Sequence, residues 1–262
     1  MNRKATRLNV RHDQLVEYVS AKGRASVEEL ARRFRVSLAT VRRDLIILER
    51  AGRLNRTHGG AIPSRTGVIE FAFSERGELY SKEKQAIGRE VAEMIERGST
   101  VALDSGTTTL EVAKALGGVE GLTVLTSSLA IASVLYGRRD VELVLLGGTA
   151  REDSPDLTGW LTEENLKRFL VDYAVVGADG VTGNGVYTRA MDLARICQAV
   201  LSAGRKSILV ADHSKMGTRS FSRYASLSQF DQVVTDTGVS SATRKWLSRA
   251  ARDVVYVKPE AS

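Results

Sequence analysis

Residues 37–45 read Ser-Leu-Ala-Thr-Val-Arg-Arg-Asp-Leu, and this stretch has the pattern of an amphipathic helix. Ser37 is a favourable N-cap, because its hydroxyl accepts a hydrogen bond from the first turn. Val41, Leu45 and Leu48 recur at the spacing of a buried helix face. The opposite face begins with small and apolar groups, which suit base edges, and continues with two arginines, which suit phosphates. The pattern predicts a DNA recognition helix whose contact residues are Ser37, Leu38, Ala39, Thr40, Arg42 and Arg43.

The residues before this helix predict two further helices. An apolar stripe from Leu8 to Val19 predicts a first helix that ends near Gly23. Residues 26–29, Ser-Val-Glu-Glu, have the form of a capping box and predict a second helix over residues 27–34. Only two residues then precede the recognition helix. Two short helices joined by so tight a turn, the second of them basic, constitute a helix-turn-helix.

A basic ribbon is expected after the recognition helix. Gly52 predicts the end of that helix, and residues 53–61 read Arg-Leu-Asn-Arg-Thr-His-Gly-Gly-Ala. This composition favours a short β-like wing that contacts the sugar-phosphate backbone through Arg56, His58 and Gly59. Residues 1–62 are therefore expected to form a small, mainly helical winged helix-turn-helix domain.

The distribution of charge supports DNA binding. Residues 1–60 contain 14 basic and 6 acidic side chains, whereas the remainder contains 24 and 25, so the basic excess is local to the first domain. Such a localised excess is typical of a nucleic-acid-binding module. The alternative is that the arginines only solvate helix faces. The caps, the helix spacing and the charge distribution together favour DNA binding over that alternative.

Composition also limits the compartment and the class of protein. The single cysteine, Cys197, excludes an internal disulfide framework and fits a reducing compartment. No apolar run approaches the roughly 20 residues that span a bilayer, and no apolar segment follows the basic N-terminus as in a signal peptide. We expect a cytoplasmic protein. The three histidines are scattered and predict no metal site.

The rest of the chain predicts an α/β domain. Residues 63–76 are expected to be a linker, and residues 77–262 a domain that begins with a helix through Ile87, Val91 and Ile95. Apolar runs that alternate with amphipathic helices predict a mostly parallel sheet covered on both faces. The expected strands are 100–104, 122–126, 141–146, 171–178, 207–212, 232–235 and 254–257, and the expected helices are 107–116, 129–136, 162–169, 193–203 and 240–250.

A polar loop follows the first expected strand. Residues 104–109 read Asp-Ser-Gly-Thr-Thr-Thr, where Gly106 permits a tight turn into a helix. The free N–H groups and the dipole at a helix N-terminus favour an anion, so a phosphate fits this loop. The loop lacks the lysine and the spacing of a P-loop, which argues against nucleotide hydrolysis. An ordinary capped turn is the alternative.

Other polar strand ends are expected at the same rim, because ligands of such sheets bind outside the carboxyl ends of the strands. Lys215 could neutralise a phosphate, and Asp104 and Asp179 could hold hydroxyl groups. Each residue alone is more often a turn residue or a surface charge, but five polar strand ends in one sheet together favour a binding site. The predicted effector-binding residues are Asp104, Ser105, Gly106, Thr107, Thr108, Thr109, Thr126, Ser127, Gly147, Gly148, Asp179, Gly180 and Lys215.

Several motifs, in this order along almost the whole chain, resemble the DeoR family of transcriptional regulators. They are residues 37–45, Arg56-Thr-His-Gly-Gly-Ala61, Leu103-Asp-Ser-Gly-Thr-Thr-Thr109, Gly177-Ala-Asp-Gly180 and Ala211-Asp-His-Ser-Lys215. The resemblance implies a winged helix-turn-helix joined to a sensor domain similar in fold to ribose-5-phosphate isomerase. It further implies a repressor of a sugar-catabolic operon that responds to a phosphorylated sugar.

The resemblance also implies positions for the effector, and this chain departs from the family pattern near them. The phosphate would lie on residues 105–109, and Asp179 and Lys215 would line the sugar pocket. Thr126-Ser127-Ser128 replaces the usual threonine-asparagine-serine. Tyr187 and Arg189 are also unusual. These departures concern the identity of the ligand more than its phosphate.

The resemblance to an isomerase raises an enzymatic alternative. Aldose–ketose isomerisation needs a carboxylate that moves a proton and a group that stabilises the enediolate. The isomerases carry two acids at Gly-Ala-Asp-Gly and a lysine in the following turn, whereas this chain has only Asp179, and residues 181–185 contain no lysine. We therefore expect a sensor and not an enzyme. A DNA-binding protein whose second domain only oligomerises is a third alternative.

Regulation would follow from a coupling of effector binding to DNA binding. Helix-turn-helix proteins usually bind operator DNA as symmetric dimers, so we expect a homodimer or homotetramer. An effector weakens DNA binding only if it favours a conformation that no longer matches the two half-sites. The predicted partners are thus double-stranded operator DNA and a phosphorylated sugar, with no cofactor and no membrane.

Overall fold

The structure is a computed structural model that describes residues 3–50, 52–63, 73–152 and 154–260, with the side chains of residues 3–10 and 50 left undescribed. The chain divides into two compact units, one within the residues up to Ser74 and the other in most of the chain that follows. Most of the predicted linker, residues 63–76, lies outside the described residues. Residues 73–78, which begin within it and extend past its end, are helical. No helix in the described part of the chain is long and apolar enough to cross a membrane.

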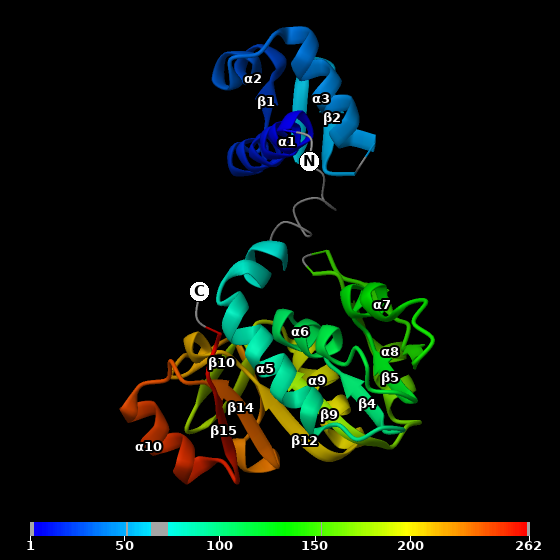
Figure 1. Cartoon of the computed structure of the whole chain (residues 1–262), viewed down its shortest axis with the longest axis vertical. Coiled ribbons are helices and arrows are strands. Elements are labelled where there is room, and N and C mark those ends of the chain that lie inside the picture. The colour runs from blue at the N-terminus through cyan, green and yellow to red at the C-terminus, as the bar shows by residue number, and fades with distance from the viewer. Residues whose placement is uncertain (1–2, 51, 64–72, 153, 261–262) are drawn as a thin grey trace. The chain divides into compact units, whose positions relative to one another are not determined.

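The first unit contains three helices and a small antiparallel sheet in its described residues (Figure 1). Val41, Leu45 and Leu48 are at most 1% exposed and pack in one apolar core with Leu15 and Val19. The predicted buried stripe of the third helix is therefore confirmed. The elements are α1 (Arg3–Lys22), β1 (Ala25–Ser26), α2 (Val27–Phe34), α3 (Leu38–Arg50), β2 (Leu54–Thr57) and β3 (Gly60–Pro63).

The predicted helix boundaries arise from local hydrogen bonds. The Ser26 hydroxyl accepts a hydrogen bond from the Glu29 N–H at 3.2 Å, and the Ser37 hydroxyl accepts one from the Thr40 N–H at 3.1 Å. Both serines thus satisfy N–H groups that a helix leaves unpaired at its start. Between the helices, Arg35 adopts a left-handed conformation with a φ of 52°, which turns the chain from α2 into α3.

The wing forms as a hairpin with an additional strand. Strands β2 and β3 pair antiparallel, and β3 also pairs with β1, which the sequence analysis did not predict. A Cβ atom at Gly60 would lie 2.1 Å from the Ala25 carbonyl oxygen. Only glycine therefore permits this close approach of β3 to β1, and backbone pairing with β1 fixes the wing to the helical part of the unit.

A buried ion cluster connects α1 to α3. Asp44, which is 2% exposed, accepts hydrogen bonds from Arg11 Nε at 2.8 Å and from Arg11 Nη2 at 3.1 Å. His12 Nε2 lies 3.1 Å from the same carboxylate. Because Asp44 immediately follows Arg43, the cluster fixes the rotation of the recognition helix about its axis. The sequence analysis assigned no role to Asp44.

The second unit is built on a seven-stranded sheet in which every pair of neighbours is parallel (Figure 1). The strand order is β15-β14-β12-β9-β4-β5-β6, so the predicted parallel sheet is confirmed. The strands are β4 (Thr100–Leu103), β5 (Leu122–Thr126), β6 (Val141–Leu145), β9 (Val171–Gly177), β12 (Gly204–Val210), β14 (Gln232–Asp236) and β15 (Val254–Val257).

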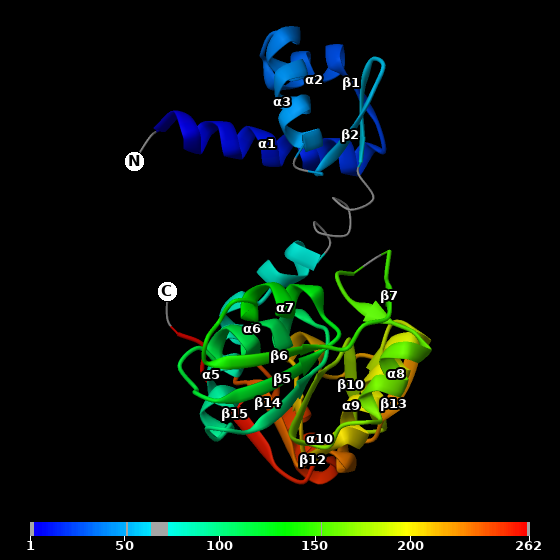
Figure 2. The same cartoon turned by 90° about the vertical axis from the view of Figure 1, so that its right-hand side faces the viewer.

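Helices cover both faces of this sheet, as predicted. One apolar core joins α5 (Ser81–Met94), α6 (Thr107–Ala115) and α7 (Leu129–Leu135) to one face. A second core joins α8 (Trp160–Leu166), α9 (Met191–Ala203) and α10 (Ser241–Ala250) to the other face. Figure 2 shows α6 and α9 on opposite sides of the strands. Successive residues of a strand enter opposite cores, as Val101 and Ala102 do, because neighbouring side chains point to opposite faces of the sheet.

Two small antiparallel sheets complete the described part of this unit, and the sequence analysis predicted neither. Strands β10 (Gly180–Thr182), β11 (Gly185–Thr188) and β13 (Ser222–Ala225) form one sheet, and β7 (Thr149–Ala150) pairs with β8 (Leu157–Thr158). These strands have two to four residues each, too few for an alternating pattern to identify them.

Candidate functional site: a recognition helix and a strand-end cradle

The predicted DNA-contacting face of α3 is exposed. Leu38 is 41% exposed, and Ala39, Arg42 and Arg43 are exposed as well, while Thr40 is partly buried beside the Ser37 cap. Asp44 and Val41 point into the unit. The helix therefore presents apolar and small groups in its first turn and two arginines in the next.

The wing residues are exposed at the tip of the hairpin. Arg56, His58 and Gly59 are all exposed, and His58 and Gly59 form the turn between β2 and β3. The Arg56 guanidinium lies 3.5 Å from a Glu49 carboxylate oxygen of α3. An exposed ion pair of this kind contributes little to stability, so Arg56 remains able to exchange Glu49 for a phosphate.

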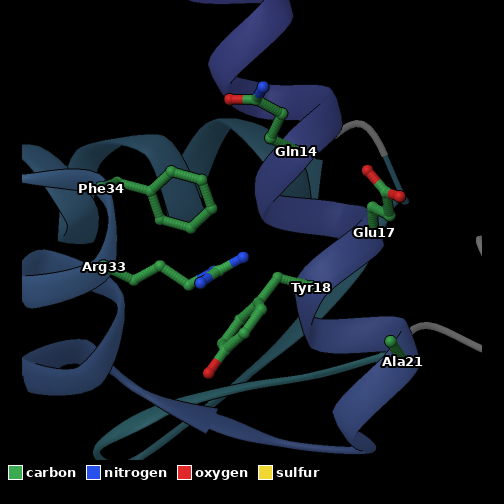
Figure 3. Close-up of a pocket in the computed structure, with 6 residues that line it drawn as sticks. All are labelled: Gln14, Glu17, Tyr18, Ala21, Arg33 and Phe34. Atoms are coloured by element: carbon green, nitrogen blue, oxygen red, sulfur yellow. The ribbon is translucent and has the colours of Figure 1, made fainter.

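A separate hollow opens on the first unit between α1 and α2. Its volume is about 530 Å³, and Arg33 lies over the Tyr18 ring with its guanidinium carbon 4.6 Å from the ring centroid (Figure 3). Phe34 packs edge-on against the same ring, with the two centroids 6.3 Å apart. These contacts hold α1 against α2. The lining residues are Gln14, Glu17, Tyr18, Ala21, Arg33 and Phe34.

In the second unit, the strand order has its switch point between β4 and β9. From β4 the chain proceeds through β5 to β6 on one side, and it then returns to β9 and continues through β12, β14 and β15 on the other. Ligands of open parallel sheets bind outside the carboxyl ends of the strands at such a point. The ends of β4 and β9 are Asp104 and residues 177–179, both of which the sequence analysis selected.

The loop after β4 forms an open helix N-terminus. Gly106 precedes α6, and no side chain in the described part of the chain caps the first turn of that helix. Thr107 is half-buried and Thr108 is 8% exposed. The Thr109 hydroxyl, in contrast, donates a hydrogen bond to the Gly106 carbonyl at 3.0 Å and is fully buried. Thr109 thus has a local structural contact, whereas the uncapped N–H groups are suited to an anion.

Ser105 connects this loop to a second loop. Its hydroxyl donates a hydrogen bond to Asp156 Oδ2 at 2.6 Å, and Arg151 Nε lies 3.6 Å from the other oxygen of Asp156. Both Asp156 and Arg151 are largely buried, with side-chain exposures of 2% and 11%. The sequence analysis missed this pair, because no spacing in the sequence relates residues 151–156 to residue 105.

Asp104 lies beneath the loop and not on its open side. It is 4% exposed, and its two oxygens accept hydrogen bonds from the Ser105 N–H at 2.6 Å and the Gly177 N–H at 3.1 Å. Burial raises the pKa of Asp104 to about 7, the two backbone hydrogen bonds oppose the rise, and the carboxylates of Asp156 and Asp179 add to it. Burial also raises the pKa of the nearby Cys197 thiol well above its ordinary value, with Asp104 adding to the rise.

Asp179 is held by the last residue of β11 and the residue after it. Its Oδ2 accepts hydrogen bonds from the Thr188 hydroxyl and the Arg189 N–H, both at 3.0 Å. The Arg189 guanidinium is 3.9 Å from the same oxygen. Gly180 is buried, and a Cβ atom there would lie 2.7 Å from the Thr218 carbonyl oxygen. Asp179 and Gly180 therefore sit at the switch point, with the carboxylate partly neutralised by Arg189.

The loop after β12 carries Asp212 and Lys215 on η1 (His213–Lys215). Asp212 is fully buried, and its Oδ1 accepts hydrogen bonds from the Ser214 N–H, at 3.0 Å, and from the Ser214 hydroxyl. Its Oδ2 is buried and has no hydrogen-bond partner among the described residues. A buried carboxylate oxygen without a partner lowers the stability of the folded protein. This oxygen is therefore suited to accept a hydrogen bond from a bound ligand.

Lys84 of α5 supplies a cation next to this loop. It is 2% exposed, and its Nζ donates hydrogen bonds to the carbonyls of Leu79, at 2.6 Å, and of Arg76. Burial lowers the pKa of Lys84; the Asp212 carboxylate opposes this effect and the Lys215 ammonium adds to it. Gly88, one turn later, allows close packing, since a Cβ atom there would lie 2.6 Å from the Glu111 backbone of α6.

We use the name cradle for a group of four parts. They are the α6 N-terminus (residues 105–109), Lys84, Asp212 and Lys215. The sequence analysis missed Lys84 and left Asp212 out of the predicted contacts. Lys84 lies in the first turns of an ordinary amphipathic helix. The only feature of the sequence that marks it is its position on the apolar face of that helix. It belongs to the apolar face, four residues before Gly88 and seven before Val91, which are both buried.

The remaining predicted residues have structural contacts at the ends of β5 and β6. The Thr126 hydroxyl donates to the Leu103 carbonyl at 2.9 Å and accepts from the Ser128 N–H at 3.0 Å, and Ser127 is 3% exposed. Gly147 and Gly148 follow the edge strand β6 with φ angles of 71° and 131°. A Cβ atom at Gly148 would lie 2.1 Å from the Thr162 hydroxyl. Close packing of α8 is thus a sufficient reason for this glycine.

Two protein families match this chain. The DeoR C terminal sensor domain matches residues 80–237, and the DeoR-like helix-turn-helix domain matches residues 11–66. The chain belongs to the DeoR family. This DeoR-family protein is therefore a DNA-binding transcriptional regulator with a sensor domain, as the sequence analysis predicted.

Relatives of this DeoR-family protein match along most of their length. The glycerol-3-phosphate regulon repressor of Escherichia coli (strain K12) is 34% identical over 86% of this chain and 90% of the relative. The HTH-type transcriptional repressor GlcR of Bacillus subtilis (strain 168) is 33% identical over 85% and 86%. Both names describe repressors, which confirms the prediction of a regulator over the enzymatic alternative. Ribose 5 phosphate isomerase A from Neisseria gonorrhoeae matches with a TM-score of 0.39 at 20% identity over 55% of each chain.

The cradle has the composition of an anion site and not of a metal site. Among the described residues, no group of three or more histidine, cysteine or acidic side chains is arranged to hold a metal ion. Two lysines and an uncapped helix N-terminus instead provide positive charge on one side of the switch point. The unpartnered oxygen of Asp212 is suited to accept a hydrogen bond from a hydroxyl group.

Proposed function

We propose that this protein represses a sugar-catabolic operon and that a phosphorylated sugar bound in the cradle modulates its grip on operator DNA. The observation that carries the proposal is that the buried Lys84 interacts electrostatically with Asp212 and Lys215, while the uncapped α6 N-terminus follows β4 at the switch point. The cations and the N–H groups suit a phosphate, and the carboxylate suits a sugar hydroxyl. The names of the relatives, which include a glycerol-3-phosphate regulon repressor, support this ligand class.

The DNA-binding half of the proposal assigns α3 to the major groove. The exposed first turn of α3 would contact base edges, Arg42 and Arg43 would contact bases and phosphates, and Arg56, His58 and Gly59 of the wing would contact the backbone. We propose binding as a symmetric homodimer or homotetramer, in the cytoplasm, where operator DNA is accessible. Residues 1–62 would form the DNA-binding domain, and residues 77–262 the sensing and oligomerisation domain.

A thermal-shift panel tests the effector half. Glycerol 3-phosphate, ribose 5-phosphate, fructose 1-phosphate, fructose 6-phosphate and glucose 6-phosphate are compared with the matching unphosphorylated compounds. A ligand at ten to a hundred times its Kd should raise stability by about 1.4–2.7 kcal/mol. Selective stabilisation by one phosphorylated compound without turnover supports a sensor. Turnover would support the enzymatic alternative, and no shift with any compound would support a domain that only oligomerises.

Variants identify the cradle as the site of that shift. Lys215→Ala and Thr108→Val should remove the shift while they leave DNA binding intact. Lys245→Ala, an exposed lysine of α10, is the matched control and should behave as the wild type. A full shift in both cradle variants would contradict the proposed site even if the protein binds the sugar phosphate.

A further inference from the structure

Residues 75–80, which precede α5, lie against the cradle. A Cβ atom at Gly77 would lie 3.9 Å from the Thr107 methyl group at the start of α6. This segment, which we name the coupling segment, follows directly after the residues that lead from the DNA-binding unit. The segment is therefore where the chain enters the sensor unit.

Lys84 connects the coupling segment to the cradle. Its ammonium group has three donors, and two of them are bound to carbonyls of the segment, those of Arg76 and Leu79. The same group interacts electrostatically with Asp212 and Lys215. A dianionic phosphate beside Lys84 would attract the ammonium by a direct charge–charge interaction, which two neutral carbonyls do not provide.

Tyr80 connects the other end of the segment to the same loop. Its ring packs edge-on against His213, with the two centroids 4.8 Å apart. Asp236 orients His213. Its carboxylate lies 2.8 Å from the ring Nδ1 of His213 and accepts a hydrogen bond from the backbone N–H of the same residue at 2.7 Å. Tyr80 has a φ of 56°, a left-handed conformation that costs a non-glycine residue energy. Surrounding contacts must maintain this conformation, so loss of those contacts would favour a different one.

We propose that the coupling segment transmits occupancy of the cradle to the DNA-binding unit, with Lys84 shared between the phosphate and the segment and Tyr80 as its anchor on His213. The inference rests on the proposed function for the existence of the effector. When a sugar phosphate draws Lys84, the carbonyls of residues 76 and 79 lose their donor. The segment then leaves the position that the Tyr80 contact maintains.

Two substitutions at Tyr80 separate coupling from binding. Tyr80→Gly removes the ring but accepts the positive φ without strain, so the variant is expected to fold. Tyr80→Phe keeps the ring on His213 and serves as the matched control. Both are made in the full chain, and thermal melting verifies folding. The probes are the five phosphorylated compounds above and a DNA fragment that the wild-type protein selects from a random-sequence pool.

Three measurements are made on each protein: the thermal shift with the probe, hydrogen–deuterium exchange of residues 73–84, and DNA affinity with and without the probe. In the wild type and in Tyr80→Phe, the probe should alter exchange in this stretch and change DNA affinity by about 5–150-fold. In Tyr80→Gly the thermal shift should persist, while the change in DNA affinity falls toward one-fold.

The outcomes distinguish the two proposals. If Tyr80→Gly binds the probe and still changes its DNA affinity by the wild-type factor, the coupling segment is not the route and the proposed function stands. Unaltered exchange of residues 73–84 in a wild type that binds the probe would overturn the inference in the same way. If no probe stabilises the wild type, the effector proposal fails, and the coupling inference fails with it.

Discussion

The Asp104 carboxylate at the end of β4 accepts a hydrogen bond from the Gly177 N–H at the end of β9, at 3.1 Å. This bond joins the two strands between which the order of the sheet reverses. It places an ionisable group, itself 4% exposed, directly beneath the cradle. Because the surrounding protein disfavours the charged form, the pKa of Asp104 is raised to about 7.

Asp104→Asn should change how stability depends on pH. Because the raised pKa of Asp104 is about 7 in the folded protein against 3.8 ordinarily, the native state keeps a proton that the unfolded chain releases between these values. Wild-type stability therefore falls as pH rises through this window. At about 1.4 kcal/mol per pKa unit, the loss amounts to about 4 kcal/mol. Relative to the wild type, the variant should gain up to this amount between about pH 4 and 8 in urea unfolding.

The control for this experiment is Asp192→Asn, which alters an exposed carboxylate. Its difference from the wild type should vary little with pH. The asparagine at position 104 also pairs less well with two N–H donors, which adds a penalty that does not depend on pH. A difference between Asp104→Asn and the wild type that stays constant with pH would show that Asp104 is ionised throughout.

Arg42→Ala and Arg43→Ala should each weaken binding to the selected DNA fragment by about 1–3 kcal/mol, because each removes a contact to a base edge or phosphate. Neither should reduce the thermal shift caused by a sugar phosphate, since the cradle lies in the other unit. Fluorescence anisotropy with labelled DNA measures the first effect. Arg168→Ala, an exposed arginine of the sensor unit, is the control. Unchanged DNA binding in both variants would exclude α3 as the recognition helix.

Asp44→Ala should destabilise the DNA-binding unit by about 3 kcal/mol, because it leaves the charge of Arg11 partly buried without a partner. Asp13→Ala is a matched control. Asp13 pairs with Arg53 at 2.8 Å but is 64% exposed, so its loss should cost less than about 1 kcal/mol. Chemical denaturation followed by circular dichroism measures both. Equal effects of the two substitutions would show that burial of Asp44 has no energetic consequence.

Gly60→Ala should disrupt the wing, whereas Gly59→Ala should be tolerated by the fold. The added methyl group at position 60 would meet the Ala25 carbonyl oxygen at 2.1 Å, and at position 59 it would meet nothing within 4 Å. Steric overlap of this kind typically costs about 1–3 kcal/mol. Thermal melting should therefore separate two neighbouring glycines. Equal melting temperatures would mean that β3 is not held against β1 in solution.

The sequence by itself determined the elements whose patterns are local. The stripe of Val41, Leu45 and Leu48 marks a helix because its period matches the helical repeat. The Ser26 and Ser37 hydroxyls each cap a helix by accepting a hydrogen bond from the N–H three residues further along the chain. The parallel sheet was also predictable, because strands buried on both faces are apolar along their length. Glycine at a strand end and threonines at a helix start indicated the cradle loop for the same local reason.

Only the tertiary structure decided which distant residues meet. Lys84 and Asp212 are 128 positions apart in the chain, and no periodicity relates them; they are brought together because α5 packs on the face of the sheet toward which Asp212 points. Alternation along β4 turned Asp104 toward α9 and beneath the cradle, although the sequence analysis expected it to bind a hydroxyl group. The number of strands between two loops, and the face on which each side chain lies, follow from sheet order and helix packing. These arise from long-range burial of apolar surface, which no short stretch of sequence contains.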